Sequence, residues 1–533
     1  MAAVRRYPPQ MIESWVRSGH WTPQATVDFW LRNAQTRPHA VALGDGREQY
    51  TWFEAAQAIQ RLAGGLVDSG VSRDAVLLVQ APNSALLVLF RLACELAGII
   101  PAFLHVGFRR AEIEAVAAKV GAAGAVVAPS EKFDALPLCR ALAGLRHLFT
   151  VEPYDAAVPC LASLPAAGGS STFEARRIRP FEMTGVVTSS GTTGLPKCIE
   201  YSCWPRLASG RVYIDRLRMS ERDVVMTCIP FYTGGGDMQF HATPQCAARL
   251  LVMPRFSAEA TCAAITRHGV TGAVMVPTMI ARIAGLTDLA DYDLSSLRWV
   301  VSGGGMLAYD VGARFEAMTG AKIVQGYGLM DYGALASHGV DDEAETRLRS
   351  IGRLLPGTEL RVVGEDGSEL PPGSTGELCA RGPHCNGGYI SDEEAMRAAW
   401  RGGFFRTGDL GRVSADGLVT LEGRSKDIVI RGGQNISAPE VEMLVCRHPA
   451  VADAALVRIA DPELGERACA CVVLRPGARL TLEDLAVFLK AQEIAAYKIP
   501  ERLEVVAEFP MTAADNKVDK RALEARIGAS PPP

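Results

Sequence analysis

Thr188-Ser-Ser-Gly-Thr-Thr-Gly-Leu-Pro-Lys197 is the stretch that says most about the fold and chemistry of this chain. It follows Val186-Val187, an apolar pair that predicts a strand. Glycines let backbone amides approach an anion closely, and each hydroxyl can donate a hydrogen bond to a phosphate oxygen. The closing lysine supplies a mobile positive charge. A strand followed by this loop therefore predicts a cradle for a polyphosphate.

The loop differs from the commoner phosphate-binding motifs. The P-loop has glycine directly before Lys-Ser/Thr, whereas Pro196 precedes Lys197 here and Cys198 follows it. The dinucleotide fingerprint requires a third glycine, which Gly326-Tyr327-Gly328 lacks. Clusters of serine, threonine and glycine are also common in plain polar loops. On its own, the stretch leaves both interpretations open.

Length, charge and cysteine usage narrow the class of protein. A chain of 533 residues is too long for one hydrophobic core, so at least two domains are expected. With a net charge of −4, the chain lacks the excess of basic residues that nucleic-acid binding requires. The 13 cysteines show no Cys-x-x-Cys spacing and indicate core residues in a reducing compartment. Without a signal-peptide core or an apolar run of transmembrane length, the chain is expected to be cytoplasmic and free of membrane.

Helical and strand patterns alternate along most of the chain. Residues 55–66 and 85–96 predict helices, and residues 75–80 and 123–128 predict buried strands. This alternation is typical of parallel sheets covered by helices, so the expected class is α/β. Near residue 423 the pattern changes, and the remainder predicts a small α+β unit of ordinary domain size.

Further motifs follow the loop in a fixed order. They are Gln325-Gly-Tyr-Gly-Leu-Met-Asp331, Phe405-Arg-Thr-Gly-Asp409, Gly423-Arg-Ser-Lys-Asp427 and Asn516-Lys517. Together with residues 188–197 they resemble the motifs of the adenylate-forming superfamily, which includes acyl-CoA synthetases, luciferases and the adenylation domains of peptide synthetases. The resemblance covers nearly the whole chain in collinear order. The tryptophan-containing N-terminal lead-in is most similar to the stand-alone aryl-acid-activating branch.

This resemblance implies a division into a body and a lid. Residues 1–424 would form a large N-terminal nucleotide- and acyl-binding domain of helix-covered sheets. A hinge at residues 425–426, which includes Lys426, would connect it to a small mobile α+β lid domain over residues 427–533. Such a lid presents a lysine for adenylation in one pose and opens a tunnel for the thiol in the other. Only a few residues need to absorb a reorientation of that kind.

The resemblance also implies an activity, that of an acid–thiol ligase. A carboxylic acid would be joined to AMP and then transferred to CoA, with ATP or acyl-AMP, Mg²⁺ and CoA as the implied cofactors. Lys197, Arg424 and Lys517 would be catalytic, and Asp331 would hold Mg²⁺. The residues assigned to the phosphates are Thr188, Ser189, Ser190, Gly191, Thr192, Thr193 and Gly194.

The remaining implied roles concern the nucleoside, the acid and the thiol. Asp409 would accept both ribose hydroxyls, since its two carboxylate oxygens suit that task, and Arg424 would meet ribose and phosphate. Tyr327 would stack on adenine. The loop opposite adenine would be Gly303, Gly304 and Gly305. The acyl pocket would include Tyr232, Thr233, Gly234 and Gly235. The pantetheine tunnel would be lined by Gly432 and Gly433.

The chain departs from the family pattern in its adenylation motifs. Met330 replaces a threonine, and a thioether cannot donate a hydrogen bond to the α-phosphate. Asp331 replaces a glutamate and shortens the expected metal ligand by one methylene. Before Lys517, the pattern gains one residue, Asn516 replaces glycine, and Asp515 adds a negative charge. A catalytic group displaced by about 1 Å costs about 10²-fold in rate.

A further departure lies in the segment assigned to the acyl pocket. Thr233 stands where the family has a histidine, and glycines 234–236 follow it. The glycines suggest room for a bulky acid, polycyclic or long-chain, although a flexible loop with no pocket role explains them almost as well.

The departures leave several hypotheses open. One is a complete ligase for a small-molecule carboxylic acid. Another is an enzyme whose adenylation half is impaired or lost, so that a separate adenylating enzyme supplies the acyl-AMP. A third is transfer to a separate phosphopantetheinyl carrier protein instead of CoA. The last is a non-catalytic nucleotide-binding relative, against which the matching Asp409, Arg424 and hinge motifs argue.

Overall fold

The computed structural model describes residues 7–129, 133–164, 173–189, 196–424, 428–431, 434–461, 464–492, 494–511 and 518–528. Contacts divide the chain into two compact units, Met1–Leu360 with Ala380–Phe405 and Arg361–Cys379 with Arg406–Pro533. Helices and strands alternate in the first unit, and the second unit combines helices with mostly antiparallel strands. This confirms the predicted α/β class with a large N-terminal and a smaller C-terminal domain. The boundary at residue 424 and the hinge at residues 425–426 stay predictions.

The first sheet of the larger unit carries the strands on either side of the phosphate loop. Its order is β18-β8-β7-β4-β3-β5-β6. The strands from β7 to β6 pair in parallel, whereas β8 pairs antiparallel with both β7 and β18. The bounds are β18 Gly388–Tyr389, β8 Lys197–Ser202, β7 Met183–Ser189, β4 Ile100–Phe103, β3 Val76–Gln80, β5 Gly124–Val127 and β6 His147–Thr150.

The second sheet of this unit has nine strands in the order β15-β14-β13-β12-β11-β9-β10-β1-β2. Its central strands are parallel, and β14, β15 and β2 are antiparallel additions at the edges. The bounds are β15 Arg353–Leu354, β14 Gly333–Ser337, β13 Lys322–Leu329, β12 Trp299–Ser302, β11 Gly272–Met275, β9 Val224–Thr227, β10 Arg249–Val252, β1 Val41–Gly44 and β2 Gln49–Thr51.

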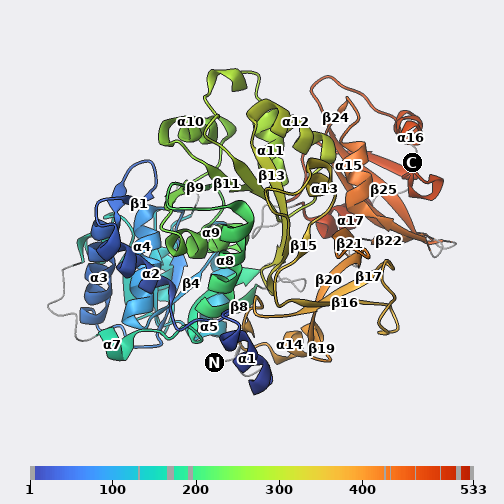
Figure 1. Ribbon diagram of the computed structural model, residues 1–533. Helices are drawn as coiled ribbons and strands as arrows, with labels where there is room; N and C mark the ends of the chain where they lie inside the picture. Colours follow the sequence, from blue (N-terminus) through green and yellow to red (C-terminus); the bar gives the residue numbers. More distant parts are fainter. Residues whose placement is uncertain are drawn as a thin grey trace. The chain divides into compact units, whose positions relative to one another are not determined.

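Helices pack against these sheets, as the alternating pattern predicts. The helices α2, α3 and α4 lie together at the blue end of the ribbon in Figure 1. The predicted helices at 55–66 and 85–96 are α3 and α4, and the predicted strands at 75–80 and 123–128 are β3 and β5. Every residue of β3 and β5 is buried, which is typical of parallel strands covered on both faces.

Local signals set the ends of these helices. Thr51 caps α3 by accepting from the Glu54 backbone N–H at 3.2 Å, and the Glu54 carboxylate accepts from the Thr51 N–H at 2.8 Å. Ser84 caps α4, which ends at Gly98 with φ of 71°. A Cβ at Gly98 would lie 2.2 Å from the Arg176 carbonyl oxygen, so only glycine fits there.

The helices of the larger unit occur in the following order along the chain. They are α1 Pro9–Arg17, α2 Thr26–Thr36, α3 Trp52–Asp68, α4 Ala85–Ala97, α5 Arg110–Val120, α6 Leu136–Ala141, α7 Phe173–Arg176, α8 Cys203–Leu217, α9 Gly234–Ala242, α10 Ala258–His268, α11 Pro277–Ala284, α12 Tyr309–Thr319, α13 Ala344–Arg349 and α14 Glu393–Ala399.

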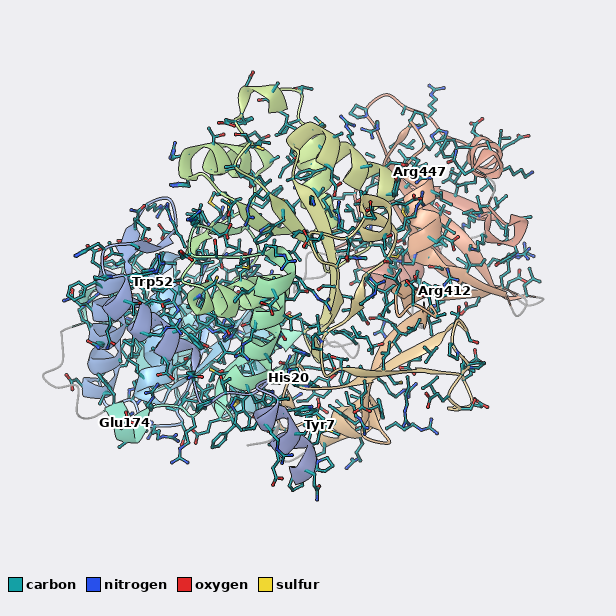
Figure 2. All side chains as sticks on the ribbon, viewed as in Figure 1. Tyr7, His20, Trp52, Glu174, Arg412 and Arg447 are labelled. Atoms are coloured by element: carbon teal, nitrogen blue, oxygen red, sulfur yellow. The ribbon has the colours of Figure 1, made fainter. Side chains whose placement is uncertain are left out.

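The N-terminal lead-in is held to the larger unit by aromatic contacts. Figure 2 labels Tyr7 and His20 on either side of α1. Trp21 stacks on Trp204 with ring centroids 4.7 Å apart, and its indole N–H donates to the Pro383 carbonyl oxygen at 2.9 Å. The lead-in therefore contacts α8 and the segment that leads into β18.

The smaller unit contains most of one sheet and the whole of another. The orders are β16-β17-β20-β19, with β21 paired to β20, and β23-β22-β25-β24, with β26 paired to β25. The bounds are β16 Glu359–Val363, β17 Gly376–Arg381, β19 Trp400–Arg401, β20 Phe404–Val413, β21 Val419–Arg424, β22 Ile428–Arg431, β23 Gln434–Ser437, α15 Ala438–Val445, β24 Val451–Asp461, β25 Gly465–Leu474, α16 Leu482–Ala491, β26 Arg502–Val505 and α17 Lys520–Gly528.

Cysteine placement and helix hydropathy agree with the composition. The cysteines, all within the described ranges, form no disulfide, and most are buried, which matches their prediction as core residues. Within the described ranges, the helices are too short or too polar to span a bilayer.

Candidate active site

The β7–β8 hairpin carries both ends of the predicted phosphate loop. Thr188 and Ser189 end β7, and Lys197 begins β8 directly opposite Ser189 in the antiparallel ladder. Backbone pairing between the two strands therefore fixes the position of the lysine at the start of β8. The loop residues Ser190, Gly191, Thr192, Thr193 and Gly194 lie outside the described residues, and their role stays a prediction.

Tyr389 contacts the predicted catalytic lysine. It ends β18, which pairs with β8 so that Tyr389 lies opposite Ile199. The Lys197 ammonium nitrogen lies 4.5 Å from the centre of the Tyr389 ring, a cation–π geometry. Nearby, the Lys119 ammonium donates to Asp392 at 2.8 Å. No carboxylate forms an ion pair with Lys197 in the described part of the chain.

Asp331, the predicted metal ligand, lies in the turn between β13 and β14. Its Oδ2 accepts a hydrogen bond from the Tyr389 hydroxyl at 2.5 Å. Burial and the Asp331 charge raise the pKa of Tyr389 well above its usual value, so the hydroxyl stays a donor. Next to it, the Asn386 side-chain amide donates to the Met330 carbonyl oxygen at 2.7 Å. The sequence did not single out Tyr389 or Asn386.

Asp331 fits a magnesium ion that is shared with a nucleotide. In the described ranges, no cluster of three or more His, Cys, Asp or Glu side chains is arranged to hold a metal. Mg²⁺ in nucleotide-dependent enzymes is commonly bound by one or two carboxylates together with substrate phosphate oxygens and water. A lone carboxylate in the same unit as the phosphate-loop strands matches that donor set.

The predicted adenine site lies where β12 and β13 end. These strands are parallel neighbours, with Ser302 opposite Gln325, so the loop that follows β12 lies beside the last residues of β13. A Cβ at Gly303 would lie 3.3 Å from the Gly326 carbonyl oxygen. Tyr327 is buried. The geometry brings the loop of residues 303–305 next to the strand that carries Tyr327, and stacking on adenine stays a prediction.

The predicted acyl pocket lies at the start of α9. Tyr232 stacks on Phe103 with ring centroids 4.5 Å apart. A Cβ at Gly235 would lie 2.4 Å from Val274 Cγ1, and one at Gly236 would lie 2.4 Å from the Pro230 carbonyl oxygen. These two glycines therefore permit close packing. Only Gly234, with nothing within 4 Å of its Cβ position, agrees with the expected open space.

A buried ionic cluster beneath this region is absent from the sequence predictions. Asp237 of α9 accepts from Arg91 of α4 at 2.6 Å and lies 3.3 Å from Arg206 of α8. His241 lies 3.5 Å from the same carboxylate and contacts Thr26 at 2.8 Å. These residues are scattered along the chain, so no local motif reveals them.

The cluster shifts the titration of its members. Burial opposes ionisation of Asp237, but Arg91, His241 and Arg206 outweigh it and hold the pKa of that carboxyl well below its usual value. Burial lowers the pKa of His241 to about 4, although Asp237 favours its charged form. The histidine is therefore neutral and the aspartate charged at neutral pH.

In the smaller unit, Asp409 and Arg424 lie opposite each other on β20 and β21. Asp409 is buried, and its backbone N–H donates to Thr407 Oγ1 at 3.1 Å. Pairing of the strands thus brings together the two residues predicted to meet the ribose. Four residues with predicted roles lie outside the described residues, and those roles stay predictions: Lys426, Gly432, Gly433 and Lys517.

The family models and the sequence relatives that match this chain point to the same family. The family described as AMP-binding enzyme matches residues 30–390, and the AMP-binding enzyme C-terminal domain matches residues 440–516. A salicylyl-CoA synthase / salicylate adenylyltransferase from Streptomyces sp. is 33% identical over 97% of this chain and 96% of its own. The salicyl-AMP ligase / salicyl-S-ArCP synthetase of Mycobacterium tuberculosis is 32% identical over 99% of this chain and 95% of its own.

A solved structure agrees with the sequence relatives. The amide bond synthetase McbA from Marinactinospora thermotolerans superposes with a TM-score of 0.83 at 26% identity, covering 94% of this chain and 99% of that chain.

Proposed function

This chain belongs to the AMP-binding enzyme family of adenylate-forming ligases, and we propose that it activates an aryl carboxylic acid with ATP and transfers the acyl group to the thiol of CoA. The observation that carries the proposal is the arrangement of Lys197, Tyr389 and Asp331. The lysine lies 4.5 Å from the tyrosine ring, and the aspartate accepts from the tyrosine hydroxyl at 2.5 Å. An ammonium and a carboxylate that form no ion pair among the described residues meet the needs of a metal-bound triphosphate.

The reaction has two steps with separate demands. First, a carboxylate oxygen of the acid attacks the α-phosphorus of ATP, and the bond to pyrophosphate breaks. Both reactants are anionic, so the Lys197 ammonium and the donors of the phosphate loop lower the barrier. Mg²⁺, when bound at Asp331, neutralises charge on the phosphate oxygens. In the second step, the thiolate of CoA attacks the acyl carbon, and AMP leaves with the electrons of the anhydride bond.

The proposed substrate class rests on the relatives. The names of both relatives specify salicylate or a salicyl group, an aryl acid, and the chain covers nearly the full length of both proteins. The Streptomyces protein is named as a CoA thioester synthase, which supports CoA as the acceptor.

Transfer to a carrier protein is the second candidate. The Mycobacterium tuberculosis relative is named for an ArCP thioester and is 32% identical to this chain. The two candidates share the adenylation step and differ only in the acceptor. Turnover that accelerates with a phosphopantetheinylated carrier and not with CoA would favour the second.

Two assays over one panel of aryl, polycyclic and fatty acids test the proposal. The first supplies acid, MgATP and CoA, and the second supplies the synthetic acyl-AMP and CoA, with thioester read by mass spectrometry. A complete ligase forms thioester in both assays. Thioester from acyl-AMP alone would show that adenylation is lost and that a separate adenylating enzyme is needed. No thioester in either assay would contradict the proposal for CoA.

Lys517 provides a sharper test of the first step. Lys517→Ala should lower thioester formation from acid and ATP while leaving the acyl-AMP assay near the wild-type rate. Lys520→Ala is the matched control, because Lys520 lies in α17 and pairs with Glu442 at 2.6 Å. An undiminished ATP-dependent rate in Lys517→Ala would show that the assigned role is wrong.

A further inference from the structure

The segment from Asn386 to Tyr389 holds the turn that carries Asp331. The Asn386 side chain donates to the Met330 carbonyl oxygen at 2.7 Å, and the Asn386 backbone N–H donates to the Tyr332 carbonyl oxygen at 2.5 Å. The Tyr389 hydroxyl donates to the Asp331 carboxylate at 2.5 Å. The single segment 386–389 therefore forms a hydrogen bond to each of residues 330, 331 and 332.

The same segment is joined to the strand that carries Lys197. Gly388 pairs with Glu200, and Tyr389 pairs with Ile199, in the ladder between β18 and β8. Lys197 is the first residue of β8. The segment that ends in β18 therefore links the strand of Lys197 to the turn of Asp331.

Tyr389 contacts the two charges with different parts of its side chain. The Lys197 ammonium lies over the ring at 4.5 Å, and the Asp331 carboxylate accepts from the hydroxyl. A ring face attracts a cation without neutralising it, and a hydroxyl leaves a carboxylate its full charge. Within the described part of the chain, Oδ1 of Asp331 accepts no hydrogen bond. That oxygen and the ammonium both remain available to a ligand.

We propose that Tyr389 is a positioning residue for the metal–nucleotide complex, which it serves by aiming the Asp331 carboxylate and keeping Lys197 from pairing with it. The inference rests on the proposed function, because it assumes that a metal-bound nucleotide occupies this site. Asp331 has one fewer methylene than the glutamate of the family pattern, so it reaches less far and depends more on an orienting partner.

The test measures Mn²⁺ binding in place of activity. Free Mn²⁺ is counted by electron paramagnetic resonance in the presence of enzyme and α,β-methylene ATP, which cannot be cleaved at the reacting bond. Tyr389→Phe removes the hydroxyl and keeps the ring under Lys197. Tyr332→Phe is the matched control, since it removes a fully buried hydroxyl one residue from Asp331 that forms no hydrogen bond to the Asp331 carboxylate. Asp331→Asn marks complete loss of the carboxylate ligand.

The expected result is a Mn²⁺ dissociation constant about tenfold weaker in Tyr389→Phe, as is typical when the partner of a metal ligand is removed. Tyr332→Phe should match the wild type. Wild-type affinity in Tyr389→Phe would overturn the inference alone, and so would an equal loss in both tyrosine variants. A wild-type protein that holds no Mn²⁺ with the nucleotide would instead contradict the ATP-dependent step of the proposed function.

Discussion

Two groups of charges in the larger unit differ in burial and in how they are paired. Asp237 is completely buried and lies within 3.5 Å of Arg91, Arg206 and His241. Asp331 and Lys197 are only partly buried, and each contacts Tyr389 instead of an opposite charge.

The difference separates a structural cluster from the proposed binding site. The buried charges form ion pairs with one another and join α4, α8 and α9. Their side chains are almost closed to solvent, although Asp237 Oδ2 and two Arg206 nitrogens make no hydrogen bond among the described residues. The charges around Tyr389 are close together but not neutralised, which leaves them able to meet phosphate and a metal ion. Charge held near an opposite charge without pairing is therefore the better indicator of a site.

Removing the buried Asp237 carboxylate should cause the largest loss in the free energy of unfolding. Asp237→Ala leaves two buried guanidinium groups without their partner, and we expect a loss of about 3–5 kcal/mol in the free energy of unfolding. Urea titration followed by circular dichroism measures it. Asp341→Ala is the control, because Asp341 pairs with Arg218 on the exposed surface and should change stability by less than about 1 kcal/mol. Equal losses of unfolding free energy in the two variants would show that the Asp237 cluster contributes no more to stability than an exposed ion pair.

Neutralising Asp331 should affect activity and not stability. Asp331→Asn can still accept from the Tyr389 hydroxyl, so the unfolding free energy should stay within about 0.5 kcal/mol of the wild type. The ATP-dependent rate should fall about 10²-fold, the usual cost of removing one preorganised charge-stabilising group. Steady-state kinetics and urea titration on the same preparation check this. An unchanged rate would show that Asp331 does not hold the metal.

Acid should destabilise the larger unit through its buried histidines. Burial lowers the pKa of both His241 and His384 from 6.5 to about 4. Below pH 6.5 the unfolded chain binds protons that the folded chain does not, so this stability is complete above pH 6.5 and is lost as the pH falls toward 4. At pH 5 each histidine should cost about 2 kcal/mol. His384→Gln should flatten the pH dependence of unfolding, and an unaltered slope would contradict the assignment.

The smallest change in stability should come from breaking the partly exposed ion pair near Tyr389. Lys119 donates to Asp392 at 2.8 Å, and both side chains are about a quarter exposed. Pairs in such surroundings contribute about 0–1 kcal/mol, and salt screens them. Lys119→Ala should therefore lower stability by less than about 1 kcal/mol, and less still in 1 M salt. A loss comparable with that of Asp237→Ala would place this pair with the buried cluster.

The sequence predicts the framework well because the framework depends on local patterns. Continuous apolar runs in β3 and β5 and the capping box at Thr51 are readable without knowing what they pack against. The apolar pair Val186-Val187 likewise predicts the strand that precedes the phosphate loop, and that strand is β7.

The side-chain partners could not be predicted in the same way. Tyr389 lies 58 residues from Asp331, and Asp237 lies 146 residues from Arg91. No helix or strand period connects positions so far apart, since their meeting depends on the order of strands in the sheets and on helix packing. The glycines after Thr233 show the same limit, because only the structure reveals Val274 and Pro230 against them.

The most direct test of the central claim is acid-dependent exchange of labelled pyrophosphate into ATP. This exchange reports the adenylation step alone and requires neither CoA nor a carrier protein. We expect exchange that is stimulated by an aryl acid and lost in Asp331→Asn. Absence of stimulation by every acid in the panel, from a protein that still converts acyl-AMP to thioester, would contradict the role given to Lys197, Tyr389 and Asp331.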